Sequence, residues 1–297
     1  KRTKWVEHLK TCNLTSGVSK LWSTVRSLSN PTKHNDKVAI TFNGCTSSDP
    51  KRCASYFSRL FILHPPGDRT KRRATRRLHK LTNDSAPLTF SGDEVQGAIN
   101  KSKSSKAIGP DGLNALMLKH LGPLGVGYLT RVFNLSLATL IIPDKWKAGR
   151  VVPLLKPGKP ANQGESYRPI TLLSPVVKTL EALLLPLLTE HLTPAPHQHG
   201  FRRVHSTTTA LTVINTQVNR GLNQNRPCER TVLVALDLQK AFDTVSHATL
   251  LDDILQSTLP PGLKRWTANY LSGRHSSVVF RDQTSKQRKI KQGVPQG

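Results

Sequence analysis

The sequence predicts an α+β fold, in which helices and strands are mixed without strict alternation. Apolar residues recur at helical spacing over residues 85–147 and 175–191. Residues 150–156 and 231–237 are instead short apolar runs rich in β-branched residues, which favour strands. A doubly wound parallel sheet requires a regular strand–helix–strand order, and the sequence does not have one. An α+β class is therefore favoured.

Residues 1–84 have the weakest folding signal, and we expect a basic linker there. The first 80 residues hold 18 Lys or Arg against four acidic residues, with one helix predicted over residues 19–28. The run from Arg69 to Lys80 fits either a solvated linker or an arm that contacts nucleic-acid phosphates. The candidate contacts in this run are Arg72, Arg73, Arg76 and Arg77.

Residues 85–147 are predicted to be helical. Ser91 followed by Glu94 is the pattern of a capping box ahead of an apolar stripe. A turn signal at residues 109–112 precedes a helix that ends at Gly122-Pro123. Another helix is expected over residues 124–140.

Residues 148–297 are predicted to contain both strands and helices. A strand over residues 150–156 is followed by a helix over 175–191, which Pro186 should kink or divide. Five consecutive apolar residues before Asp237 predict a strand that is buried on both faces.

The last part of the chain is predicted to contain two helices and a hairpin. The first helix begins near Ser246, and the second covers residues 262–272. The hairpin joins residues 276–280 to 286–291. Asp243 fits a turn or cap ahead of the first of these helices.

The charge of the chain points to a polyanionic partner. The formal net charge is +26 and the pI is near 10.5, a surplus that repels itself unless an anion neutralises it. No apolar run is long enough for a membrane helix, and the scattered cysteines are typical of a reducing, intracellular compartment. Phosphate-binding loop and serine-nucleophile motifs are missing, so ATPase and hydrolase readings lack support. Zinc is disfavoured because the clustered histidines lie far from the cysteines.

Asp237 is the residue that points most directly to chemistry. A carboxylate at the end of a buried strand is costly to desolvate unless a cation lies beside it. It is either a cap for the following turn or a ligand of a hard divalent cation such as Mg²⁺. In so basic a chain, a metal at this place suggests phosphoryl transfer on nucleic acid.

Residues 237–245 (DLQKAFDTV) resemble the first catalytic palm motif of reverse transcriptases encoded by non-LTR retrotransposons, closest to jockey-like elements. Further blocks resemble that family in its own order: KAIGPDGL (106–113), WKAGRVVPLLKPGK (146–159), SYRPITLLS (166–174), QHGFRRVHST (198–207) and QGVPQG (292–297). The resemblance covers roughly residues 85–297. It implies a partial right-hand polymerase: a helical N-terminal extension over 85–147, then fingers and an incomplete palm over 148–297, without a thumb. Residues 1–84 would join it to an upstream endonuclease.

The resemblance also implies roles for single residues. Asp237 and the carbonyl of Leu238 would bind two Mg²⁺ ions, and Phe242 would exclude a ribose 2′-hydroxyl, although core packing is the alternative for Phe242. The other nucleotide-binding candidates are Lys156, Arg168, Gln296 and Gly297. Gly200, Phe201 and Arg202 would shape the template path, with Phe201 equally suited to the core or to base stacking.

We therefore expect an RNA-directed DNA polymerase that transfers a nucleotide from a dNTP to a DNA 3′-hydroxyl. Its partners would be the element RNA as template and target DNA as primer, with no membrane; the oligomeric state is left open. It would act in the nucleus at integration and before that in a cytoplasmic ribonucleoprotein. The family's adjacent aspartates do not follow the Gln-Gly block here, so we expect a truncated chain that is inactive alone. The rivals are a non-catalytic basic remnant of a decayed element and, with less support, a group II intron-type maturase.

Overall fold

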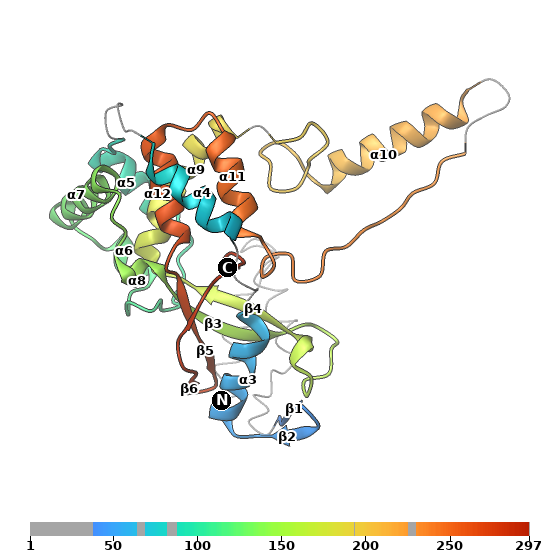
Figure 1. The fold of residues 1–297 in the computed structure, drawn as a ribbon, viewed down its shortest axis with the longest axis horizontal. Coiled ribbons are helices and arrows are strands. Elements are labelled where there is room, and N and C mark those ends of the chain that lie inside the picture. Colours follow the sequence, from blue (N-terminus) through green and yellow to red (C-terminus); the bar gives the residue numbers. More distant parts are fainter. Residues whose placement is uncertain (1–37, 64–68, 82–87, 193, 225–229, 297) are drawn as a thin grey trace, which may run out of the picture.

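The computed structural model describes residues 38–63, 69–81, 88–192, 194–224 and 230–296. The helix predicted over residues 19–28 and the candidate site residue Gly297 lie outside these ranges. The described residues form helices, a five-stranded sheet and a two-stranded sheet (Figure 1). The α+β class is confirmed at this level.

The five-stranded sheet combines two parts of the chain that are far apart in sequence. Its strands are β3 (Ala148–Leu155), β4 (Tyr167–Leu172), β5 (His275–Phe280), β6 (Gln283–Thr284) and β7 (Arg288–Lys289). β3 pairs antiparallel with β4 and parallel with β5. β6 and β7 each pair antiparallel with β5. The predicted strand is present as β3 and the first strand of the predicted hairpin as β5, and the parallel pairing joins them. The return of the hairpin differs from the prediction, because β6 lies within the turn predicted over residues 281–285 and only β7 falls within 286–291.

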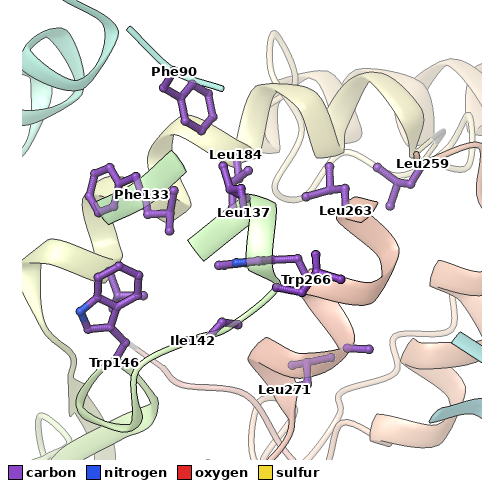
Figure 2. Packing of buried hydrophobic residues seen from close by; sticks show 14 of the residues in the cluster. Phe90, Phe133, Leu137, Ile142, Trp146, Leu184, Leu259, Leu263, Trp266 and Leu271 are labelled. Atoms are coloured by element: carbon purple, nitrogen blue, oxygen red, sulfur yellow. The ribbon is translucent and has the colours of Figure 1, made fainter. Parts of the chain in front are cut away.

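Most helices surround one large apolar core. They are α5 (Gly92–Lys101), α6 (Ala115–Lys119), α7 (Pro123–Thr139), α8 (Asp144–Lys147), α9 (Pro175–His191), α11 (His247–Gln256) and α12 (Pro261–Leu271). Figure 2 shows part of this core, where Phe133 meets Trp146 edge-on with ring centroids 5.9 Å apart. The buried Trp266 donates its indole N–H to Ser136 at 3.1 Å, so its polar atom is satisfied.

Local signals determine where several helices begin. Ser91 and Glu94 form the predicted capping box of α5, and Ser246 caps α11 by accepting the Thr249 N–H. Pro186 was predicted to kink or divide its helix. It does not divide it, since α9 continues through Pro186. Burial of the apolar side of α9 in the core compensates for the one ladder bond that proline removes. No helix in the described ranges has the length and apolar content to cross a bilayer.

Residues 40–61, within the segment expected to be a linker, fold against the sheet. β1 (Ile40–Phe42) and β2 (Cys45–Ser47) pair antiparallel, and α3 (Pro50–Phe61) follows, capped by the Asp49 carboxylate. The buried side of α3 packs on β3 and β5 in a second core: Ile40, Cys53, Ala54, Phe57, Phe61, Val151, Val278 and Phe280. The sequence analysis missed this unit because two three-residue strands carry almost no periodic signal.

The basic run of residues 69–80 is a docked helix, so the solvated-linker interpretation is wrong for it. α4 (Arg69–His79) packs against α11 and α12. Ala74 and Leu78 are buried, and their spacing of four residues puts them on one side of the helix. This narrow apolar edge is enough to hold a strongly basic helix on the body.

The prediction of a buried strand over residues 231–237 is also wrong. The segment joins neither sheet of the described residues. Four of its side chains are between 71% and 90% exposed: Val232, Leu233, Val234 and Leu236. α10 (Thr207–Leu222), which the sequence analysis did not predict, precedes it and extends away from the other elements (Figure 1). Apolar residues favour burial, but a strand is buried only where neighbouring strands pair with it and cover it.

Candidate nucleotide and nucleic-acid site

The exposed face of α4 concentrates positive charge. Ala74 and Leu78 point inward, whereas Arg72, Arg73, Arg76, Arg77 and Lys80 are exposed and line one hollow of about 560 Å³. The helix has no acidic residue, so these cations repel one another along about two turns. A polyanion would relieve this repulsion, which makes the face suited to phosphates.

The β3–β4 hairpin carries two of the predicted nucleotide contacts. Arg168 lies opposite Leu154 in the register, and strand alternation puts it on the same face as Lys156, just past the end of β3. The Lys156 ammonium donates to the Glu165 carbonyl at 2.8 Å, whereas the Arg168 side chain is exposed. Arg168 is thus directly accessible to a triphosphate, and Lys156 would first have to release Glu165.

The loop of residues 291–296 joins this hairpin to the turn of residues 240–245. The Gly293 N–H donates to the Val245 carbonyl at 2.9 Å, and the Val294 N–H donates to Phe242 at 2.8 Å. On the other side, the Gln296 carbonyl accepts the Thr171 N–H of β4 at 2.6 Å. Backbone hydrogen bonds therefore connect the block of residues 292–297 both to the block of residues 166–174 and to the block of residues 237–245.

Gly293 is needed for this close approach. Its φ is +80°, and a Cβ there would lie 2.7 Å from the Asp243 carbonyl oxygen. Any side chain would therefore push the loop away from the turn. The sequence analysis named Gly297 of this block as a nucleotide-binding candidate and missed Gly293; the signal was a second glycine in the same short block, next to Gln292.

The turn of residues 240–245 matches expectation. The Asp243 N–H donates to the Lys240 carbonyl at 2.8 Å, so Asp243 is a turn residue as predicted. Burial raises the pKa of the Asp243 carboxyl, and the Lys240 ammonium opposes that shift. The Phe242 side chain in this turn is 36% exposed to solvent.

Phe201 lies beside Phe242. The two rings meet edge-on with centroids 6.3 Å apart. Phe201 is 99% exposed and has a φ of +56°, so it is not a core residue; an exposed ring is available for base stacking. Its neighbour Gly200 is exposed, and Arg202 donates to the Ala195 carbonyl at 3.4 Å. The structure thus brings the predicted template block next to the predicted nucleotide block.

Asp237 and Leu238 lie in the exposed segment that joins neither sheet. The burial on which the metal argument relied is therefore missing here. Two Mg²⁺ ions require several oxygen ligands, and the described residues contain no group of three or more His, Cys, Asp or Glu side chains suited to a metal. Asp237 is chemically suited to be one ligand, but this part of the chain does not form a magnesium site by itself.

Comparison with known proteins gives an independent line of evidence. Residues 156–297 match the family described as reverse transcriptase (RNA-dependent DNA polymerase). The chain is 34% identical over 217 residues to the probable RNA-directed DNA polymerase from transposon X-element of Drosophila melanogaster, covering 71% of this chain and 23% of that protein. It is 34% identical over 215 residues to the RNA-directed DNA polymerase from mobile element jockey of Drosophila funebris, with the same two coverages.

A more distant relative extends the pattern. The Pol polyprotein from type-1 retrotransposable element R2 of Popillia japonica is 30% identical over 211 residues, which cover 69% of this chain and 28% of that protein. The chain thus spans about a quarter of the length of the curated relatives it matches.

Proposed function

Because residues 156–297 belong to the reverse transcriptase family, we propose that this chain forms part of the RNA-directed DNA polymerase of a jockey-like non-LTR retrotransposon. The proposed reaction adds a deoxynucleotide to the 3′-hydroxyl of a target DNA primer under the direction of the element RNA. In this proposal residues 85–147 are a helical N-terminal extension, and residues 148–297 are fingers and part of a palm. Residues 1–84 would connect them to an endonuclease.

The observation that carries the proposal is the convergence of three separate motifs. Hydrogen bonds from the loop of residues 291–296 reach both Thr171 of β4 and the turn that holds Phe242. Arg168 lies on the same strand as Thr171. In the proposal, Phe242 faces the sugar and the loop of residues 291–296 borders the base. Arg168 is three residues from Thr171 on β4, so its side chain lies on the opposite face of the strand from Thr171, and it would bind the triphosphate from the exposed β3–β4 hairpin. A guanidinium binds phosphate oxygens through paired hydrogen bonds, which suits Arg168 to this role.

We assign the remaining roles within the same proposal. Lys156 adds a second cation for the triphosphate, and Gln296 with Gly297 borders the nucleotide. Asp237 and the Leu238 carbonyl would hold Mg²⁺ together with carboxylates from elsewhere in the polymerase. When bound, the metal would activate the primer hydroxyl and stabilise the charge of the leaving pyrophosphate.

The nucleic acid is proposed to contact two surfaces. The basic face of α4 binds phosphates, and the exposed Phe201 ring, with Gly200 and Arg202 beside it, lies along the template path. Location follows from the proposed reaction: the nucleus at integration, and a cytoplasmic ribonucleoprotein before it.

A non-catalytic nucleic-acid-binding remnant is the rival proposal. Two observations favour it: the outer side of α4 is strongly basic, which suits phosphates whether or not chemistry follows, and Asp237 is not part of any group of three or more metal-ligating side chains among the described residues. Primer extension by the complete element protein that contains this chain separates the two proposals.

The deciding test uses primer extension on an RNA template with Mg²⁺. Arg168→Ala should raise the KM for dNTP by about tenfold or more, the loss of one charge-assisted contact, with template binding unchanged. Phe242→Ala should admit ribonucleotides. Lys101→Ala, an exposed charge at the end of α5, is the matched control and should behave as wild type. A complete protein that binds RNA but never extends a primer would favour the remnant.

A further inference from the structure

Lys71 of α4 points away from the side that carries Arg72, Arg73, Arg76 and Arg77. Lys71 lies on the side of the buried Ala74 and Leu78, at positions i, i+3 and i+7. Its ammonium is 2.7 Å from Nδ1 of His247 and donates to the Lys291 carbonyl at 3.3 Å. The half-buried Lys71 ammonium is therefore engaged by α11 and by the chain at residue 291.

His247 continues this chain of contacts into the site. It is the first residue of α11 and is only 2% exposed. Its Nε2 lies 2.7 Å from the Gly293 carbonyl. Because an ammonium has only protons to give, Nδ1 must accept and Nε2 must carry the hydrogen, which fixes a neutral ring in one tautomer.

The ring is held in that state by its surroundings. Burial lowers the pKa of His247, and the nearby Lys71 and Arg274 cations lower it further, against the hydrogen bond to Gly293. A neutral imidazole with both nitrogens bonded is a rigid spacer between an ammonium and a backbone carbonyl.

The carbonyl that His247 holds belongs to the tightest point of the site. Gly293 is packed against Asp243 with no room for a Cβ, and its own N–H donates to Val245. Val294 then bonds to Phe242. A shift of Lys71 would therefore be passed through His247 to the residues that support Phe242.

We propose that Lys71 and His247 are positioning residues that couple phosphate binding on the outer face of α4 to the loop of residues 291–296. The coupling rests on the proposed function, because it takes that face as the nucleic-acid contact and that loop as the border of the nucleotide site. Nucleic acid bound to α4 restrains the helix, and the Lys71–His247 pair transmits the restraint to Gly293. The polymerase site would thus become ordered when a template is present.

The test is amide hydrogen exchange on the 297-residue chain, with and without a short oligouridine RNA. In wild type, RNA should slow exchange of the Gly293 and Val294 amides by about threefold or more, since local opening in this loop becomes rarer. Lys71→Met keeps the aliphatic stem and His247→Phe keeps the ring volume, but both remove the hydrogen bonds. Each should still bind RNA while losing the RNA-dependent slowing.

Two further variants control for charge loss and for mere structural damage. His247→Gln retains one donor and one acceptor and should restore part of the slowing. Lys101→Met removes a charge at α5, away from this pair, and should retain all of it. RNA binding without any change at Gly293 and Val294 in wild type, or slowing that persists in both Lys71→Met and His247→Phe, would overturn the coupling alone. Failure of wild type to bind RNA at all would overturn the proposed function as well.

Discussion

Gly293 shows at the scale of one residue how the site depends on close backbone approach. Replacement by Ala should cost about 1–3 kcal/mol, since a left-handed φ and a contact of 2.7 Å with the Asp243 oxygen are both strained. Urea denaturation measures this cost. Gly97→Ala is the matched control, because it lies inside α5 with nothing within 4 Å of a Cβ. That change should stabilise the chain by roughly 0.5–1 kcal/mol. Equal effects of the two substitutions would refute the close-packing argument.

Asp237 is the residue on which proposed catalysis depends. In the complete element protein, Asp237→Asn should abolish primer extension, because the amide keeps the shape but removes the negative charge that a metal requires. RNA affinity should change by less than about twofold, since a single exposed carboxylate contributes little to the binding of a polyanion. Filter binding and primer extension on one preparation provide both numbers. Extension by the Asn variant would remove Asp237 from the site.

His247 should make stability depend on pH. Burial lowers its pKa below 6.5, so the unfolded chain takes up this proton more readily than the folded chain. Stability is therefore full above about pH 6.5 and falls as the pH drops toward the folded-state pKa, by at most about 1.4 kcal/mol per pH unit. The raised pKa of Asp243 has the opposite effect on stability as the pH falls. The effect of His247 is therefore measured as the difference between wild type and a variant that lacks the imidazole. The free energy of unfolding of wild type should fall more steeply from pH 7.5 to 5.5 than that of His247→Phe. Parallel curves would contradict the buried neutral ring.

At the scale of elements, the two sides of α4 have different functions: one docks the helix on the body, and the other presents positive charge. Its buried edge holds it on α11 and α12, and its outer side carries four arginines, with Lys80 just past the end of the helix. Substitutions on the buried side should therefore change the stability of the chain, and substitutions on the outer side should change its affinity for nucleic acid.

Neutralising the outer side tests this separation. Changing Arg72, Arg73, Arg76 and Arg77 to Gln should flatten the slope of log affinity against log salt on single-stranded RNA by up to about 3, at about 0.7 per phosphate contact. Stability should be unchanged or higher, because mutual repulsion is removed. The control neutralises four exposed cations on the α3 and β6 side: Lys51, Arg52, Arg59 and Lys286. If the control flattens the slope equally, α4 is not the contact.

At the scale of the whole molecule, the exposed apolar segment of residues 231–238 is the main departure from a closed fold. Its side chains would normally be covered, and the proposed palm supplies a reason: a strand here needs neighbouring strands on both edges. Hydrogen exchange should be fast at these amides in the 297-residue chain and slowed by about a hundredfold or more in the complete element protein, where the sheet is extended. The amides of β3 should be protected in both. Fast exchange of residues 231–238 in the complete protein would show that this segment is not a palm strand.

The sequence by itself determined the features that depend on a few neighbouring residues. Ser91 with Glu94 and Ser246 cap helices through contacts three residues away, so their pattern predicted α5 and α11. The ordered motifs predicted the family, which the match over residues 156–297 supports; the polyanionic partner expected from the +26 charge stays a prediction. Only the tertiary structure decided that α4 docks through Ala74 and Leu78 and that Gly293 packs on Asp243. It also decided that the apolar run before Asp237 stays exposed. A cap carries its hydrogen-bond partner within its own turn, whereas burial and loop packing depend on surfaces contributed by distant segments, which local sequence does not specify.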